Sequence, residues 1–162
     1  MKKIGLAVLL FIVVVGALLF PVKTGFDVSD GKGKRLLFIP GEGEVTVGWR
    51  HSVEKTPWRE TYRVEDGGEL TLAYTEYKMY GAGTPDREGK AELKSDGTIR
   101  VTGIERTIPY YSLFYVPISQ YFIEVGKKDY PLEEFVTEYE EVHISFEQVR
   151  LYEWLLMGMP HF

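Results

Sequence analysis

The sequence predicts an all-β fold, an antiparallel β-sandwich or barrel-like domain, with an N-terminal transmembrane helix and a short C-terminal helix. Short segments in which apolar and polar residues alternate predict strands with one buried face. Clusters of Gly, Asp, Ser and Lys separate these segments at intervals of about 8 to 12 residues, a spacing typical of hairpin-rich β-domains. Aromatic residues make up 14% of the chain and include 11 Tyr, which favours strands.

The chain divides into an anchor, a tether and one domain. Residues 1–23 hold an apolar anchor, residues 24–34 are rich in Gly, Asp and Lys and are expected to form a tether, and residues 35–162 are expected to fold as a single β-rich domain. The clearest alternation starts at Val45 and places His51 on the apolar face of its strand. The predicted strands are residues 35–39, 45–53, 60–64, 70–77, 90–94, 98–105, 110–116, 121–125 and 142–146.

An uncharged apolar run from Ile4 to Phe20 follows Lys2 and Lys3. As a helix it would span about 25 Å, close to the thickness of a bilayer core. The residues after the run lack the small side chains of a signal-peptidase site, so the segment is expected to remain as a signal-anchor. Because Lys2 and Lys3 outnumber Lys23 beyond the run, the positive-inside rule predicts a single-pass cell-membrane protein with a cytoplasmic N-terminus and an extracytoplasmic domain.

The C-terminal helix is expected over residues 147–157. Ser145 and Gln148 have the spacing of a capping box, and the apolar residues that follow gather on one side. We expect this helix to pack against the sheet. A helix in the membrane interface is the alternative, although the segment has no basic face.

Composition excludes several classes of function. Residues 21–162 carry 17 basic and 24 acidic side chains, so nucleic acid is a poor partner. The chain has no Cys, which excludes disulfides and thiolate metal sites. It also has no Asn and only two Gln, a depletion of thermolabile residues that suggests a thermophilic source.

The densest group of polar residues spans the predicted strand at 45–53 and the start of the next one. It contains Arg50, His51, Ser52, Glu54, Glu60 and Tyr62. His, Ser and Glu could form a nucleophilic triad or a metal site, but neighbours on a strand point to opposite faces, which argues against both. In the structural alternative, His51 donates to a buried acceptor and Arg50 pairs with a glutamate across the hairpin. We therefore predict no catalytic residue, no metal and no cofactor.

Two other features could bind a ligand. Gly81 and Gly83 end the strand at 70–77 and could present backbone N–H groups to an anion, although a tight structural turn explains the same pattern. Arg106 could anchor a carboxylate, or could pair with a local glutamate. The aromatic run at 110–115 is expected to be a strand covered on both faces, with a carbohydrate-stacking surface as the alternative.

These motifs together resemble the domain-of-unknown-function family 1850. The residues that carry the resemblance are Trp49-Arg50-His51-Ser52-Val53-Glu54, Pro57, Glu60, Tyr62, Gly81-Ala82-Gly83-Thr84-Pro85 and Arg106. The resemblance covers Glu44 to Leu132 and leaves residues 135–162 as an extension. It implies a short protein with an N-terminal hydrophobic segment, encoded beside fused permeases of TAXI-type TRAP transporters and without an established activity.

Three functions follow from these observations. The leading one is a non-enzymatic, membrane-tethered accessory or binding module that contacts a TRAP-type permease or its small solute outside the cell. The second is an extracytoplasmic hydrolase or metal-dependent enzyme that uses His51, Ser52, Glu54 and Glu60. The third is a purely structural scaffold. Convergence of the candidate residues on one concave surface would favour binding.

Overall fold

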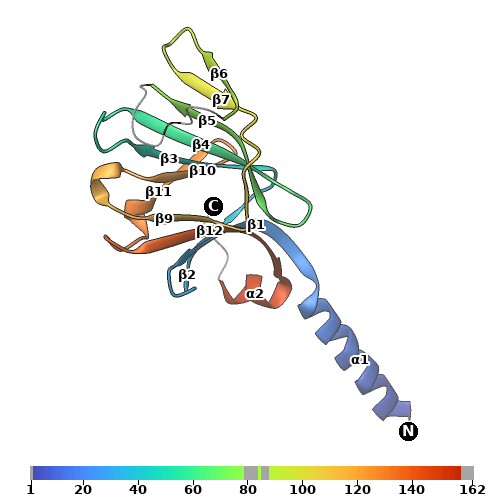
Figure 1. The fold of residues 1–162 in the computed structure, drawn as a ribbon. Coiled ribbons are helices and arrows are strands. Elements are labelled where there is room, and N and C mark those ends of the chain that lie inside the picture. Colours follow the sequence, from blue (N-terminus) through green and yellow to red (C-terminus); the bar gives the residue numbers. More distant parts are fainter. Residues whose placement is uncertain (1, 79–83, 85–87, 158–162) are drawn as a thin grey trace.

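The computed structural model describes residues 2–78, 84 and 88–157 (Figure 1). Helix α1 (Lys2–Leu19) leads through Phe20 into the first strand, β1 (Pro21–Asp30). The strands that follow are β2 (Arg35–Pro40), β3 (Glu44–Arg50), β4 (Pro57–Val64), β5 (Leu70–Tyr77), β6 (Lys90–Leu93), β7 (Ile99–Thr102), β8 (Thr107–Ile108), β9 (Tyr111–Phe114), β10 (Phe122–Val125), β11 (Lys128–Pro131) and β12 (Glu141–Arg150). The other helical segments described are η1 (Pro117–Ser119), η2 (Leu132–Glu134) and α2 (Leu151–Leu156).

The described strands form two antiparallel sheets that share one core. The smaller sheet has the order β2-β1-β12-β9, and the larger has the order β11-β10-β3-β4-β5-β7-β6, with β8 paired to β5. The sheets face each other in Figure 1. Phe26 of β1 and Ile144 of β12 lie in the same buried cluster as Val47 of β3 and Ile123 of β10, all at 0% exposure. The predicted antiparallel β fold is confirmed.

Most predicted strands are present with shifted ends. Strand β5 has the predicted bounds, although a bulge at Ala73 shifts its buried positions from residues 70 and 72 to residues 75 and 77. Strand β3 stops at Arg50 instead of Val53, since residues 52–54 form a turn. Strand β4 starts earlier than predicted, at Pro57. The short strands β8 and β11 were not predicted.

The tether predicted at residues 24–34 is wrong, because most of that segment is strand β1. Phe26 and Val28 alternate with Asp27 and Ser29, and both apolar side chains have 0% exposure. Strand β1 pairs with β12 on one side and with β2 on the other. Gly and Asp gave the segment the composition of a linker, but its alternation is that of a buried strand. The domain therefore follows α1 directly.

The predicted C-terminal helix starts too early, since β12 continues to Arg150 and pairs with β1 along its length. The helix begins only at Leu151, where the Glu153 carboxylate accepts a 2.7 Å hydrogen bond from the Arg150 N–H. The Ser145–Gln148 capping box is absent because both residues lie in the strand. Nor is the tail an extension of the fold. Strand β12 lies inside the smaller sheet and buries Val142 and Ile144 completely.

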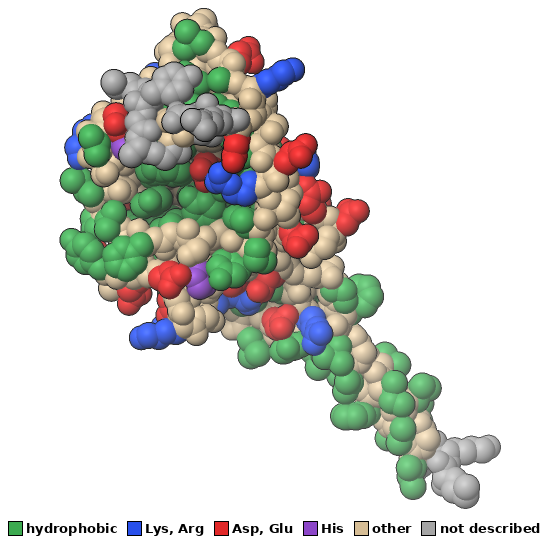
Figure 2. Space-filling view, viewed as in Figure 1, with side chains coloured by type: hydrophobic (Ala, Val, Ile, Leu, Met, Phe, Trp, Pro, Cys, Tyr) green, Lys and Arg blue, Asp and Glu red, His purple; other side chains and the backbone are tan. Residues whose placement is uncertain are grey.

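Helix α1 projects away from the sheets, and its apolar side chains are exposed on all sides (Figures 1 and 2). Ile4, Leu6 and Phe11, for example, expose 68–70% of their surface. Among the described residues, no helix has both the length and the apolar character that crossing a membrane requires. The span at residues 4–20 stays a prediction.

Candidate binding site

The inward face of β3 and β4 combines aromatic rings with one carboxyl group. In the β3–β4 register, Trp49 lies opposite Trp58, Val47 opposite Glu60 and Val45 opposite Tyr62. Alternate residues of a strand share a face, so Glu60 lies between Trp58 and Tyr62 on the side that faces the other sheet. Figure 2 shows a hollow lined by hydrophobic side chains on the face where the two sheets meet, with charged side chains at its edge.

Glu60 is the centre of a polar cluster that joins the two sheets. The Tyr62 hydroxyl donates a 2.8 Å hydrogen bond to Glu60 Oε2. Tyr111, from β9 in the smaller sheet, packs its ring edge-on against Tyr62 with centroids 5.4 Å apart. Tyr121, just before β10, completes the group. We call Glu60, Tyr62, Tyr111 and Tyr121 the Glu60 cluster.

Burial controls the proton affinities in the Glu60 cluster. It raises the pKa of the Glu60 carboxyl, and the Tyr62 hydrogen bond and the nearby Arg106 charge only partly offset this. Burial, together with the charge of Glu60, also raises the pKa of Tyr62, Tyr111 and Tyr121. The three phenols therefore keep their protons at neutral pH, and Tyr62 uses its proton in the hydrogen bond to Glu60.

A stacked aromatic column borders the Glu60 cluster. His51 stacks on Trp58 at 5.7 Å, Trp58 on Trp49 at 5.4 Å, and Trp49 on Tyr121 at 5.8 Å. Trp58 Nε1 donates a 2.9 Å hydrogen bond to Thr75 Oγ1 on β5. Stacked rings and a satisfied indole N–H therefore form this side of the site.

His51 lies in the turn after β3, so its predicted place on the apolar face of a strand is wrong. The turn is closed by hydrogen bonds from His51 N–H to the Thr56 carbonyl (2.9 Å) and from Lys55 N–H to the His51 carbonyl (3.0 Å). It also brings His51 Nδ1 into contact with Glu54 Oε2. The expectation that these two side chains point apart fails because it assumed a strand.

The remaining candidates are dispersed. Ser52 is exposed in the same turn, and Arg50 donates a 3.3 Å hydrogen bond to the Lys55 carbonyl instead of pairing with a glutamate. Arg106 is half-exposed, lies 3.7 Å from Glu88 and acts on Glu60 through its charge. Gly81 and Gly83 lie outside the described residues. Of the candidates, Glu60, Tyr62 and Arg106 belong together, and His51 with Glu54 forms a neighbouring pair.

Two members of the cluster, Tyr111 and Tyr121, were not predicted to join Glu60, although Tyr111 lies in the aromatic run at 110–115. Glu60 itself could have been placed with more precision, because Trp58, Glu60 and Tyr62 already alternate in the sequence. Starting that strand at residue 57 would have put the carboxyl on the buried face. Tyr111 comes from the opposite sheet, and no local pattern reports contacts between sheets.

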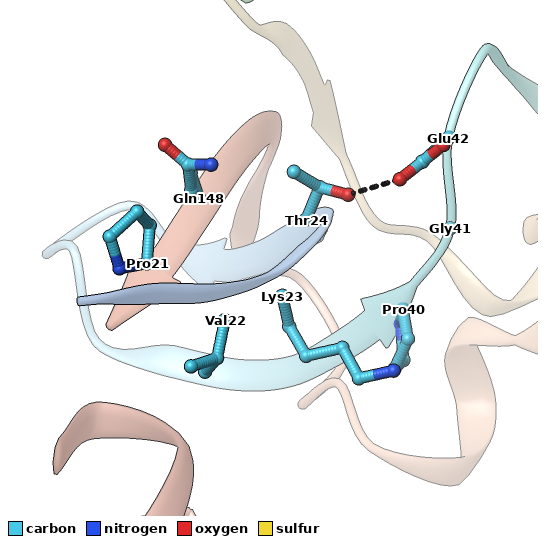
Figure 3. A pocket seen from close by; sticks show the side chains of 8 residues that line it. All are labelled: Pro21, Val22, Lys23, Thr24, Pro40, Gly41, Glu42 and Gln148. Atoms are coloured by element: carbon cyan, nitrogen blue, oxygen red, sulfur yellow. Dashed lines mark hydrogen bonds between the residues drawn. The ribbon is translucent and has the colours of Figure 1, made fainter. Parts of the chain in front are cut away.

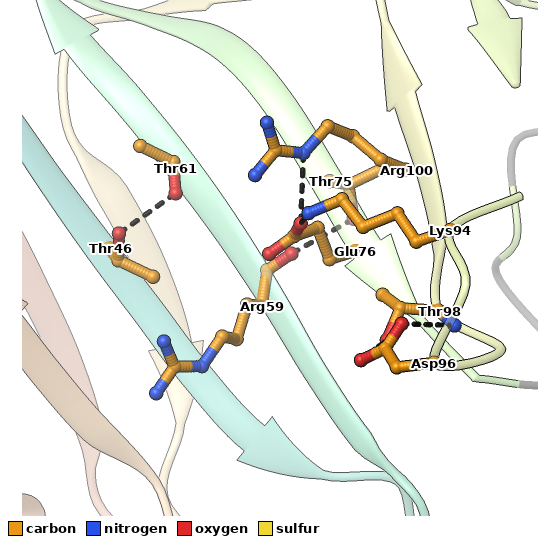
Figure 4. Close-up of polar contacts among 9 residues, drawn as sticks. All are labelled: Thr46, Arg59, Thr61, Thr75, Glu76, Lys94, Asp96, Thr98 and Arg100. Atoms are coloured by element: carbon orange, nitrogen blue, oxygen red, sulfur yellow. Dashed lines mark hydrogen bonds and ion pairs between the residues drawn. The ribbon is translucent and has the colours of Figure 1, made fainter. Parts of the chain in front are cut away.

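Other polar features lie away from the cluster. On the outer face of the larger sheet, Glu76 accepts hydrogen bonds from Lys94 and from Arg100 (2.8 Å), as Figure 4 shows. An open groove of about 480 Å³ lies at the start of β1, where Thr24 Oγ1 donates a 3.0 Å hydrogen bond to Glu42 (Figure 3). In the part of the chain that is described, no three His, Asp or Glu side chains gather as metal ligands.

Fold and site together define an antiparallel two-sheet domain with a carboxyl–tyrosine cluster between its sheets. The family model described as "Domain of unknown function (DUF1850)" matches residues 45–132, more than half of the chain, and the chain therefore belongs to this family. No curated protein and no solved structure matches the chain. The matched region contains the whole Glu60 cluster, whereas β1, β2 and β12 lie outside it.

Proposed function

We propose that this chain is a membrane-tethered, extracytoplasmic binding module whose ligand site is the Glu60 cluster. The observation that carries the proposal is the position of one carboxyl group among three tyrosines between the sheets. Among the described residues only Tyr62 hydrogen-bonds to it, through Oε2, which leaves Oε1 available to a ligand. A partly buried carboxyl without a cation bonded to it is costly for a fold to keep, and such groups gather at functional sites.

The chemistry of the cluster fits a small polar solute. Glu60 supplies an acceptor, the phenols of Tyr111 and Tyr121 supply donors, and aromatic rings form the walls. Arg106 adds positive charge near Glu60 and could hold an acidic group of the same solute. The proposal includes a supporting role in TRAP-type solute uptake, with the neighbouring permease as partner.

The location of the module is part of the proposal. Helix α1 is apolar on every face and packs against no sheet, which is the surface that a lipid environment accepts. Lys2 and Lys3 before the helix favour a cytoplasmic N-terminus. The domain would then work outside the cell membrane, within reach of a permease in the same bilayer.

Ligand binding can be tested through tryptophan fluorescence, because Trp49 and Trp58 border the cluster. The full-length protein is titrated with succinate, glutamate and glucose as probes of acidic, zwitterionic and neutral solutes. We expect at least one probe to change the emission of the wild type and of Glu76→Gln, whose carboxylate lies on the outer face, but not that of Glu60→Gln. Equal responses of wild type and Glu60→Gln would contradict the assignment of the site.

The partner is tested in membranes. The tagged full-length chain is expected to co-purify with a TRAP-type permease from its own cells, and its deletion is expected to reduce solute uptake. If no permease associates and uptake is unchanged in the deletion strain, the transport role should be abandoned.

A hydrolase that uses His51, Ser52 and Glu54 is the second candidate, and the contact between His51 and Glu54 is the observation that favours it. A base oriented by a carboxylate is one half of a nucleophilic triad. Hydrolysis of p-nitrophenyl acetate that disappears in Ser52→Ala would support this reading. A rate that is unchanged in Ser52→Ala and His51→Ala would end it.

A further inference from the structure

An apolar patch lies at the base of the domain, where α1 leads into β1. It consists of Phe20, Val22, Leu155 and Leu156, and we call it the basal patch. Leu156 exposes 82% of its surface, Phe20 66% and Leu155 60%. Figure 2 shows the hydrophobic surface of α1 continuing onto the domain at this point.

We infer that the basal patch lies in the interfacial layer of the bilayer that holds α1, so that α2 is a second membrane contact. This inference rests on the proposed membrane attachment of α1. It goes further, because it fixes how the domain sits on the membrane surface.

The end of α1 and the start of α2 are joined in the fold. The Leu151 N–H donates a 3.0 Å hydrogen bond to the Phe20 carbonyl, and α1 contacts α2. Only Phe20 separates α1 from β1, so no flexible linker lets the domain move away from the end of the helix. A bilayer that surrounds α1 therefore reaches the basal patch as well.

Helix α2 is also held firmly against the sheet. Trp154 packs edge-on against Phe38 of β2, with ring centroids 6.2 Å apart. Arg35 reaches Met157 at the end of the helix, with 3.8 Å between Nη1 and Sδ, and bonds to Glu147 of β12. With Trp154 turned toward the sheet, Leu155 and Leu156 are left pointing outward.

The charges around the patch indicate which lipid interaction is used. Lys23 and Arg150 are exposed nearby, but Glu153 lies beside Arg150. Arg35 is paired with Asp27 and Glu147, so the surface has no excess of positive charge. An interfacial helix without a basic face binds by burying apolar area instead of by attraction to anionic lipids. We therefore expect the contact in neutral phosphatidylcholine, with little dependence on salt.

The chain has no Cys, so a single introduced cysteine carries one spin label. Three full-length variants, Leu156→Cys, Val8→Cys and Leu93→Cys, are labelled and reconstituted in phosphatidylcholine nanodiscs. Val8 reports on α1, and Leu93, 72% exposed on β6, is the matched exposed apolar control in the domain. Power-saturation electron paramagnetic resonance compares access of oxygen, which enriches in lipid, with access of a water-soluble nickel chelate.

We expect the labels at 156 and 8 to favour oxygen several-fold over the label at 93. A lipid-exposed label at 8 with a water-exposed label at 156 would overturn the inference and leave the proposed attachment intact. A water-exposed label at 8 would instead overturn the attachment. A label at 156 shielded from both reagents would show that protein covers the patch, which also contradicts the inference.

Discussion

At the scale of single residues, the position of Glu60 links the fold to its function. The carboxyl lies on the inward face of β4, where burial raises its pKa above the ordinary value of 4.5. Glu76 lies on the outer face of the neighbouring strand β5. Burial raises its pKa too, but the hydrogen bonds from Lys94 and Arg100 outweigh that effect and lower the pKa. The contributions of the two carboxylates to the free energy of unfolding therefore change with pH in opposite directions.

Replacing Glu60 should change how stability depends on pH. Because its pKa is raised on folding, the folded protein keeps the Glu60 proton at pH values where the unfolded chain has lost it. Stability from this residue is present below pH 4.5 and is lost as pH rises through the raised pKa. We expect the free energy of unfolding of the wild type, relative to Glu60→Gln, to fall as urea denaturation is repeated from pH 4.5 to 8. If the free energies of unfolding of the wild type and Glu60→Gln change in parallel with pH, the burial of the Glu60 carboxyl would be contradicted.

Glu76→Gln is the matched variant with the opposite sign. The lowered pKa of Glu76 adds stability above pH 4.5 that is lost as pH falls through the lowered value. At pH 7 we expect Glu76→Gln to be less stable than the wild type by about 1 kcal/mol or less, as is usual for ion pairs at the surface. In urea denaturation the difference should close as the pH falls below 4.5. A stability difference that widens below pH 4.5 would contradict the ion pairs of Glu76 with Lys94 and Arg100.

The hydroxyl of Thr75 supports the aromatic column. It accepts the 2.9 Å hydrogen bond from Trp58 Nε1 and donates a 3.1 Å hydrogen bond to the Arg59 carbonyl. Thr75→Val would leave the buried indole N–H without an acceptor, and we expect a loss of about 1–3 kcal/mol in chemical denaturation. Thr71→Val, at a more exposed position on the same strand, should cost no more than about 0.5 kcal/mol. Equal losses of unfolding free energy in Thr75→Val and Thr71→Val would show that the buried Trp58–Thr75 hydrogen bond adds no stability of its own.

At the scale of elements, β1 is packed so closely that one of its residues must be glycine. A Cβ added at Gly25 would press against the carbonyl oxygen of Ile39 on β2, a backbone atom that cannot turn aside. We expect Gly25→Ala to lower the free energy of unfolding by about 1–3 kcal/mol. Gly67→Ala, where a Cβ meets nothing within 4 Å, should be neutral or up to about 1 kcal/mol more stable. An unaffected Gly25→Ala variant would mean that β1 is not fixed in the sheet.

An element can be predicted from the sequence when the pattern that determines its bounds lies within the element or beside it. Strand β5 could be placed within a residue because a turn at residues 66–68 precedes a run rich in strand-forming residues. Alternation also marks Phe26 and Val28, but polar neighbours made β1 resemble a linker. The end of β3 depends on the turn that follows Arg50, and the length of β12 depends on its pairing with β1, a partner more than a hundred residues away. Pairing at that distance leaves no local pattern.

The candidate site likewise combines residues that a local pattern identifies with residues that it does not. Glu60 and Tyr62 could be identified because they lie on one strand in an unusual polar segment. Their neighbours Tyr111 and Tyr121 could not, since the opposite sheet and a separate loop supply them. His51 and Glu54 were wrongly separated because a turn had been predicted as strand.

At the scale of the whole molecule, the family-matched segment and the folding unit differ. Residues 45–132 form the larger sheet and strand β9, but the smaller sheet takes β1, β2 and β12 from outside this range. Those strands bury Phe26, Val28, Val142 and Ile144 completely, in the same core as the larger sheet.

A fragment of residues 45–132 should therefore not fold alone. Burying one large apolar side chain stabilises a fold by about 1.5–3 kcal/mol, so losing four of them removes a free energy comparable with the net stability of a typical domain, about 5–15 kcal/mol. The fragment would also leave β9 without its partner β12. We expect no cooperative transition by circular dichroism for residues 45–132, and a cooperative one for residues 21–157, which restore both missing sides of the core. Cooperative melting of the shorter fragment would show that the larger sheet is stable without the smaller one, and that the Glu60 cluster does not need Tyr111 held by β12.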